Sequence, residues 1–148
     1  MTQPALAQIA PTSRRAVAYV IDALIAAALS TVLTIILVAS ALSAGPDMLA
    51  VVAAGAPLVS LALLAWLIVY TFMQSGGGSI GMRVQGLRLV RESDGAPLGF
   101  GMTLVRNIVF GLSAAIVVGY FTPLFDGTGR FQGWHDKVAK SLMLDARL

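Results

Sequence analysis

The stretch that decides the fold runs from Ala16 to Leu42 and reads AVAYVIDALIAAALSTVLTIILVASAL, with Asp22 as its only charged residue. As a helix, a run of this length is long enough to cross the ~30 Å hydrocarbon core of a bilayer. Arg14 and Arg15 precede it, and a basic start before an apolar stretch also fits a signal peptide. The run is longer than a typical signal, and a poor cleavage site follows it. We therefore expect a first transmembrane helix over residues 16–42.

Two further apolar segments follow. Residues 49–72 carry no charge and, as a helix, span about 36 Å, enough for a second crossing with some tilt. The third segment covers residues 102–125, with Arg106 near its start and glycines and Pro123 inside it. Its length fits a crossing, but its glycines also permit a break.

The composition favours a bilayer environment. Charged residues make up 11% of the chain and hydrophobic residues 57%, with a mean hydropathy of +0.85. A soluble domain carries roughly 25% charged residues. The chain has no cysteine and only one histidine, which argues against disulfides, thiolate chemistry and a multi-histidine metal site. We expect no metal and no cofactor, and the basic residues form no patch of the kind that binds nucleic acid.

The distribution of Lys and Arg leaves the topology open. The N-terminal tail holds two of these residues, the loop at 43–48 none, the segment 75–101 three and the tail at 126–148 four. The positive-inside rule then predicts a cytoplasmic N-terminus and a cytoplasmic segment 75–101. A third full crossing would put the basic C-terminal tail outside. Either residues 102–125 are re-entrant or interfacial, which we favour, or they span and the tail is an exception.

Short strands are expected on the cytoplasmic side. Residues 84–91 partly alternate between apolar and polar side chains before an Asp94-Gly95 turn, and residues 140–145 are also strand-like. A re-entrant third segment would let the two pair.

The expected fold is an all-α membrane protein with two transmembrane helices, a third apolar segment that is re-entrant or spanning, and a small cytoplasmic cap of short strands. We divide the chain into a flexible tail (1–13) and one membrane domain (14–148), with helices 16–42 and 49–73, a loop and strand at 75–101, an apolar segment at 102–125 and a C-terminal tail at 126–148.

Asp22 is the most informative residue for function. It lies about two turns inside the first helix, where a carboxylate facing lipid costs a few kcal/mol. It should therefore face protein or water, on a stripe that includes Tyr19 and small residues. Arg15 lies on the same face but leans away toward the headgroups, so its direct bond to Asp22 is not expected. The candidate partners are Arg106, Arg83, His135 and Lys137. Two interpretations stay open: a structural ion pair, or a site for a solute, an ion or a proton.

The run His135-Asp136-Lys137 also has two interpretations. The His–Asp pair could handle protons, since histidine titrates near physiological pH. Alternatively, a helix starts here with Asp136 or a neighbour as its cap and Trp134 at the membrane interface.

Catalytic motifs are weak. Gly76 to Gly81 formally match G-x-G-x-x-G, but a membrane helix precedes them and a strand follows, the reverse of what pyrophosphate binding needs. Read as a P-loop, the stretch has Met82 and Arg83 where Lys and Ser or Thr are required. No serine stands in a G-x-S-x-G context. We expect no enzyme and assign no catalytic residues.

Three blocks resemble the RDD family of bacterial membrane proteins, which is named for one arginine and two aspartates. The first block runs from Arg15 to Asp22, the second from Gly78 to Val90 with Asp94-Gly95 and Arg106 after it, and the third from Gln132 to Ala139. The resemblance covers residues 14–144. One departure is Met82, where the family usually has lysine.

The resemblance implies a multi-pass protein of the bacterial inner (plasma) membrane. It implies Arg15, Asp22 and Asp136 as a binding or structural charge cluster, with Tyr19, Arg83, Arg106 and His135 as secondary candidates. The family is suspected of transport, which would need a homo-oligomer or a partner membrane protein, since two or three spans cannot enclose a pathway. The leading hypothesis is therefore transport of a cation or small solute as an oligomer. The alternative is a non-transporting accessory or scaffold subunit of a larger membrane complex.

Overall fold

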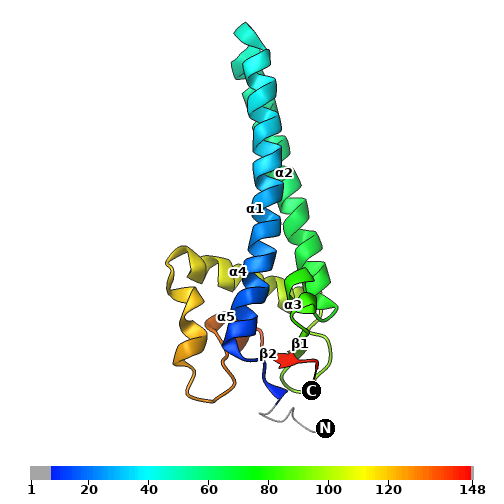
Figure 1. The fold of residues 1–148 in the computed structure, drawn as a ribbon, viewed down its shortest axis with the longest axis vertical. Helices are drawn as coiled ribbons and strands as arrows, with labels where there is room; N and C mark the ends of the chain where they lie inside the picture. Colours follow the sequence, from blue (N-terminus) through cyan, green and yellow to red (C-terminus); the bar gives the residue numbers. More distant parts are fainter. Residues whose placement is uncertain (1–7, 148) are drawn as a thin grey trace. The chain divides into compact units, whose positions relative to one another are not determined.

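The computed structural model describes residues 8–147 and is mostly helical, with two long apolar helices and one small sheet (Figure 1). This agrees with the expected fold at that level. The 3-10 helices are labelled η. The elements in order are α1 (Thr12–Ser43), η2 (Gly45–Asp47), α2 (Met48–Ser75), α3 (Ile80–Val84), β1 (Leu87–Arg91), α4 (Phe100–Ala115), η3 (Val118–Tyr120), η4 (Thr122–Phe125), α5 (Trp134–Val138) and β2 (Ser141–Asp145).

The chain divides into two compact units. The hairpin unit is Asp22–Val69, and the mixed unit combines Met1–Ile21 with Tyr70–Leu148, of which residues 8–21 and 70–147 are described. The helices α1 and α2 each begin in one unit and end in the other.

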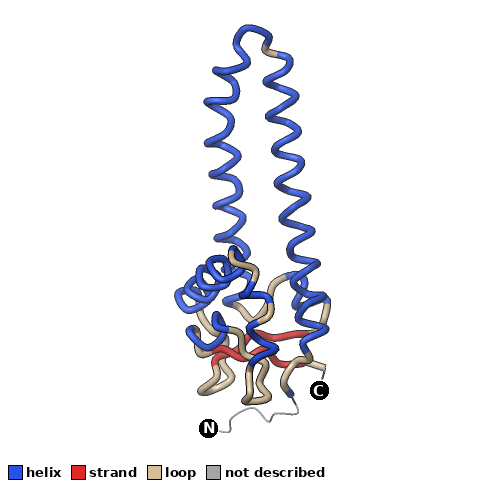
Figure 2. The backbone as a smooth tube through the Cα atoms, turned by 90° about the vertical axis from the view of Figure 1, so that its left-hand side faces the viewer, coloured by secondary structure: helices blue, strands red, loops and turns tan. Residues whose placement is uncertain are grey.

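In the hairpin unit, α1 and α2 lie side by side and antiparallel, joined by η2 (Figures 1 and 2). Their contact is close at Gly55, where an added Cβ would lie 2.3 Å from Leu37 Cδ1. The helix α2 continues through Pro57.

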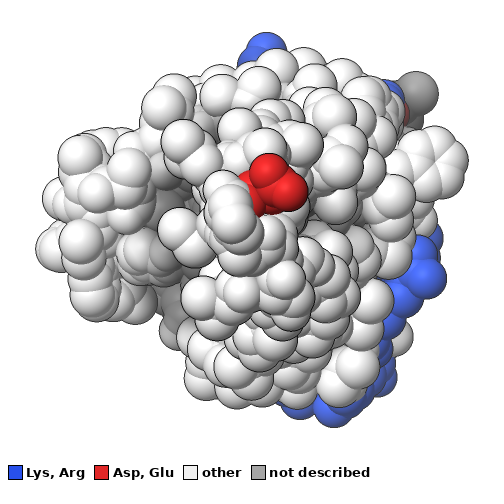
Figure 3. All heavy atoms as spheres, turned by 90° about the horizontal axis from the view of Figure 1, so that it is seen from above, with Lys and Arg blue, Asp and Glu red and all other residues white. Residues whose placement is uncertain are grey.

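Both helices are long and apolar enough to cross a bilayer. Only 6% and 0% of their most apolar windows are buried, so large side chains such as Leu24 and Leu49 face outward. Figure 3 shows one acidic side chain amid a broad uncharged surface. A helix that is apolar all round requires lipid or another protein as its neighbour.

The third apolar segment forms a short helix followed by turns. The helix α4 has 16 residues, about 24 Å of rise, and ends where Val117 adopts a positive φ of 64°. The turns η3 and η4 follow, and α4 runs across the ends of α1 and α2 that belong to the mixed unit (Figures 1 and 2). Since α4 is shorter than a ~30 Å core, residues 102–125 do not form one continuous spanning helix. The break falls at residues 116–117, between Gly111 and Gly119, in the segment whose glycines permit a break.

A two-stranded sheet near the C-terminus also receives the start of the described chain. The strands β1 and β2 are antiparallel, with Leu87 opposite Asp145 and Arg91 opposite Ser141, which is the pairing expected from the sequence. Ile9 forms a bridge with Leu144, and the Ala10 N–H donates to the Met143 carbonyl at 2.9 Å. The expected flexible tail (1–13) therefore does not reach residue 13, and its residues 1–7 lie outside the described residues. The start of α1 and the C-terminal strand belong to one unit.

A small apolar core holds the mixed unit together. Leu89 is fully buried among residues from α1, α3, both strands and the loops. The helix α3 was not expected within the segment 75–101; it starts because the Ser79 hydroxyl accepts the Met82 N–H as an N-cap. The core consists of Ala10, Ala18, Met82, Leu87, Leu89, Leu98, Ala139 and Met143.

Candidate functional site: a buried arginine–aspartate cluster

The centre of the site is Asp136, whose side chain is 2% exposed. Gly133 is the N-cap of α5, and Asp136 reaches back to accept the Gly133 N–H on Oδ2 at 3.3 Å. Its other oxygen, Oδ1, accepts hydrogen bonds from Arg106 Nε at 2.8 Å and from the Ser141 hydroxyl at 3.1 Å. Thus α4, α5 and β2 meet on one carboxylate.

Arg15 approaches the same carboxylate from the first turn of α1. Its Nη1 lies 3.8 Å from Asp136 Oδ2 and also donates to the carbonyl of Phe131, while Nη2 donates to the Met143 carbonyl at 3.4 Å. The guanidinium fork therefore binds one carboxylate and two backbone carbonyls. This arrangement uses the fixed geometry of arginine, which lysine lacks.

His135 completes the cluster. Its Nε2 lies 3.4 Å from Asp136 Oδ2, and its ring meets Phe110 edge to face at 4.9 Å between centroids. Burial, with smaller contributions from the nearby Arg106 and Arg15, lowers the pKa of His135 to about 4 against the opposing effect of Asp136. The imidazole is therefore neutral at pH 7, packed as part of the core.

The electrostatics make Asp136 a permanent anion at neutral pH. Burial raises the pKa of Asp136, but Arg106, with further contributions from His135 and Arg15, lowers it to about 2. Two guanidiniums surround one carboxylate, and the imidazole is neutral, so the four side chains together carry a net positive charge. A carboxylate held this firmly in its ionised form fixes structure and does not release or take up protons near pH 7.

A second buried carboxylate, Asp126, lies before α5 and was not identified from the sequence. Its Oδ2 accepts the Thr128 hydroxyl at 2.7 Å and the Gln132 N–H at 3.0 Å, and Lys137 Nζ lies 3.0 Å from Oδ1. Burial raises the pKa of Asp126, but these donors together hold it well below its usual range. The Asp126-Gly127-Thr128-Gly129 run is a turn signal that could have indicated this loop.

Aromatic residues line the cluster on the α4 side. The hydroxyl groups of Tyr19 and Tyr120 are 2.8 Å apart, and both rings meet Phe110 edge to face. Because Phe110 also contacts His135, Tyr19 is linked to the cluster through one ring.

Of the residues considered from the sequence, Arg15, Arg106, His135 and Asp136 come together. Arg83 does not join them in any described contact: its Nε donates to the Gly78 carbonyl at 3.0 Å. Asp22 belongs to the hairpin unit, where it is buried and has a partner. Ser141 and the carbonyls of Phe131 and Met143 were missed, since no sequence pattern marks a backbone acceptor.

Two long apolar helices, with a small mixed unit built on a buried arginine–aspartate cluster, define a membrane-type protein. The chain belongs to the RDD family, whose model matches residues 9–140. Met82, the departure from the family pattern noted in the sequence, is buried in the apolar core, so this position serves packing here.

Curated relatives share part of the chain. The proline-rich antigen of Mycobacterium leprae (strain TN) is 34% identical over 89 residues, which are 59% of this chain and 34% of that protein. The proline-rich antigen homolog of Mycobacterium tuberculosis (strain ATCC 25618 / H37Rv) is 41% identical over 68 residues, 45% of this chain and 28% of that protein. The chain thus spans about a third of the length of the curated relatives it matches. No solved structure matches it.

Proposed function

We propose that the chain is a non-enzymatic accessory or scaffold module that crosses the plasma membrane as a helical hairpin and presents the mixed unit to partner proteins. The observation that carries the proposal is the saturation of Asp136. Its two oxygens are occupied by Arg106, Arg15, Ser141 and the Gly133 N–H. Because its oxygens already accept these donors, the carboxylate fixes the structure of the mixed unit and has little remaining capacity to bind a transported cation.

The charge distribution supports a cytoplasmic mixed unit. All ten Lys and Arg residues lie in the mixed unit, and residues 22–69 of the hairpin unit have none. By the positive-inside rule, this favours a cytoplasmic N-terminus and a cytoplasmic C-terminus on either side of one hairpin. A paired cytoplasmic and periplasmic reporter fused after Leu148 tests this: we expect only the cytoplasmic reporter to be active. A periplasmic signal would exclude the proposed orientation.

Transport as a homo-oligomer is the second candidate, and Asp22 favours it. This carboxylate is 8% exposed and is the only charged residue in the apolar run from Ala16 to Leu42. Intramembrane carboxylates commonly mark ion or proton pathways. A single hairpin encloses no pathway, so this candidate requires several copies or a partner membrane protein.

One experiment separates the two candidates. The purified chain is reconstituted into vesicles under Na⁺, K⁺ and proton gradients, and ion flux is followed with D22N and D47N as matched variants. The exposed Asp47 lies in the loop between α1 and α2. The accessory role predicts flux equal to that of empty vesicles for all three proteins, and a defined complex after gentle solubilisation. Flux that D22N abolishes and D47N preserves would refute the accessory role and establish transport.

A further inference from the structure

The helix α4 is amphipathic in the reverse sense of a helix on a soluble protein. Its buried residues are polar: Thr103, Arg106 and Ser113. Its exposed residues are apolar and recur at helical spacing, and the apolar surface continues through η3 and η4 to Phe125. A helix with this pattern is stable where its outer face meets acyl chains, in the boundary between headgroups and hydrocarbon. The exposed apolar residues of α4 are Phe100, Met102, Val105, Ile108 and Leu112.

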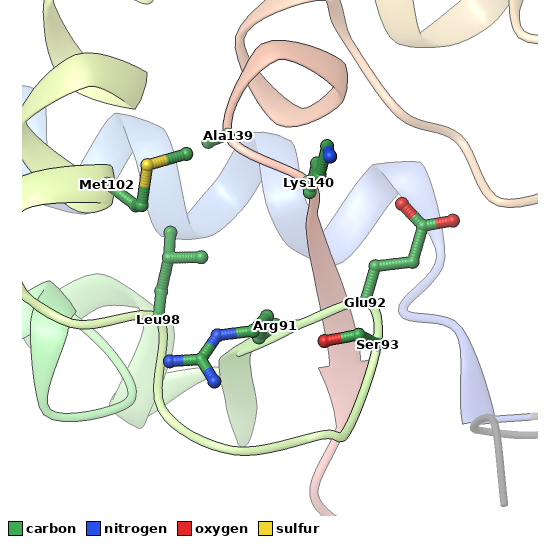
Figure 4. Close-up of a pocket in the computed structure, with 7 residues that line it drawn as sticks. All are labelled: Arg91, Glu92, Ser93, Leu98, Met102, Ala139 and Lys140. Atoms are coloured by element: carbon green, nitrogen blue, oxygen red, sulfur yellow. The ribbon is translucent and has the colours of Figure 1, made fainter.

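A pocket of about 330 Å³ lies beside the first turn of α4. Leu98, Met102 and Ala139 form its apolar part. Figure 4 shows Leu98 and Met102 along one side, with the side chains of Lys140 and Glu92 across from them. Because Met102 belongs both to the pocket and to the exposed apolar residues of α4, the pocket lies beside the apolar face of that helix.

The charges at the rim favour an anionic ligand. Glu92 is already bound, since Arg130 and the Gln132 side-chain amide both donate to it. Arg91 pairs with Asp94 within an exposed turn. Lys140 is exposed and, within residues 8–147, has no salt-bridge partner. Its ammonium group is therefore available to a ligand in the pocket.

The backbone of Lys140 gives a second reason to assign it a role. Its φ is +48°, in the left-handed region, directly after the C-cap of α5. Glycine is the usual residue at this place because it has no Cβ to strain. Backbone strain of this kind is common at binding sites, so the strained Lys140 at the pocket rim is consistent with a binding role.

We propose that this pocket binds the headgroup of an anionic phospholipid from the leaflet in which α4 lies. The phosphate accepts hydrogen bonds from Lys140 Nζ, and the glycerol and first acyl carbons cover Leu98 and Met102. Lysine near an anionic leaflet attracts such headgroups, and the apolar floor distinguishes a lipid from a free anion. The proposal goes beyond the accessory role and uses only the membrane location.

The test is lipid binding to the purified full-length chain in detergent, measured by native mass spectrometry with phosphatidylglycerol and phosphatidylcholine. We expect one phosphatidylglycerol to bind in preference to phosphatidylcholine, and K140Q to weaken its binding about fivefold. The matched control is R88Q, which removes an exposed cation of β1 outside the pocket. Unchanged binding by K140Q overturns the proposal, and so does an equal loss in R88Q, which would mean diffuse attraction.

Two further measurements exclude misfolding and a free anion. K140G removes the cation and relieves the positive φ, so it should bind less phosphatidylglycerol and melt at a higher temperature than the wild type. Inorganic phosphate should not displace phosphatidylglycerol at equal concentration; displacement would overturn the assignment to lipid. A negative lipid result leaves the flux and complex measurements unaffected, so failure of this proposal is distinguishable from failure of the accessory role.

Discussion

Arg106 on α4 donates from Nε to Asp136 Oδ1 on α5 across 2.8 Å, and the two side chains are 7% and 2% exposed. The same carboxylate accepts the Gly133 N–H and the Ser141 hydroxyl and lies 3.8 Å from Arg15 Nη1. Buried ion pairs contribute little compared with well-packed apolar residues, but removing one partner leaves an uncompensated charge. The stability of the mixed unit therefore depends on keeping the whole group of donors together.

Replacing Asp136 by Asn should destabilise the protein by about 3–5 kcal/mol, because Arg15 and Arg106 then remain buried without an anion. Thermal unfolding in detergent, followed by circular dichroism, measures this change. The control is D47N at an exposed loop, where we expect a change within about 0.5 kcal/mol. Equal melting temperatures for D136N and the wild type would mean that the cluster contributes no stability.

Arg106 and Asp136 should be strongly coupled in a double-mutant cycle. The double variant R106Q/D136N should lose about 1–3 kcal/mol less unfolding free energy than the sum of the two single variants. The reason is that the second substitution removes a charge that the first has left without its partner. A parallel cycle of D136N with R83Q should be additive within about 0.5 kcal/mol. Arg83 donates to the Gly78 carbonyl and shares no described partner with Asp136. Additivity in both cycles would contradict the pairing.

The stability of the protein should fall between pH 6.5 and pH 4 because of His135. Its pKa is about 4 in the folded protein and ordinary, near 6.5, in the unfolded chain. The unfolded state therefore binds the proton first as the pH falls, and folding loses up to about 3 kcal/mol across this window. Above pH 6.5 His135 contributes no pH dependence.

The variant H135Q isolates this effect. Its melting temperature should change less between pH 6.5 and 4 than that of the wild type, even if the lost contact with Phe110 lowers it at every pH. Below pH 4 both proteins should lose further stability, because Asp136 takes up a proton near its ordinary pKa of 3.8 in the unfolded chain but only near pH 2 in the folded protein. An equally steep profile in H135Q would assign the pH dependence to another group.

Gly133 should tolerate no side chain. An added Cβ would lie 2.6 Å from His135 Cε1 and 3.0 Å from Thr122 Oγ1, so G133A must displace His135, which contacts Asp136, and Thr122, which accepts the Trp134 N–H. We expect a loss of about 1–3 kcal/mol in thermal unfolding. The matched control is G127A, whose Cβ meets nothing within 4 Å and which should be neutral or slightly stabilising. Equal effects of the two substitutions would contradict the packing described around His135.

The sequence predicted the elements whose signals are local. Long apolar runs predicted α1 and α2, and alternation together with a turn predicted the pairing of β1 with β2. The helix α3 was missed because its five residues show no periodicity, although Ser79 is an ordinary N-cap. The end of α4 at Val117 was also not predictable, because a β-branched residue with a positive φ contradicts its own preference.

The site was also predicted only in part, because its residues, unlike its geometry, carry a local signal. Arg15, Arg106, His135 and Asp136 were candidates because ionisable residues are rare in this chain. Their arrangement around Asp136 depends on tertiary contacts between residues that are far apart in the chain. Arg106 and Asp136, for example, are separated by 30 positions. The carbonyls that bind Arg15 carry no mark in the sequence.

The bond between Arg14 and Asp145 has a consequence for biosynthesis. These side chains meet at 2.5 Å although 131 positions separate them in the chain. The Ala10 N–H likewise donates to the carbonyl of Met143, which is synthesised much later. At ordinary translation speeds the ribosome needs on the order of ten seconds to pass from one partner to the other. The helices α1 and α2 are complete long before β2 exists, so they can enter the bilayer during translation. The first turn of α1 then remains without its final contacts until β2 has been synthesised and has left the ribosome.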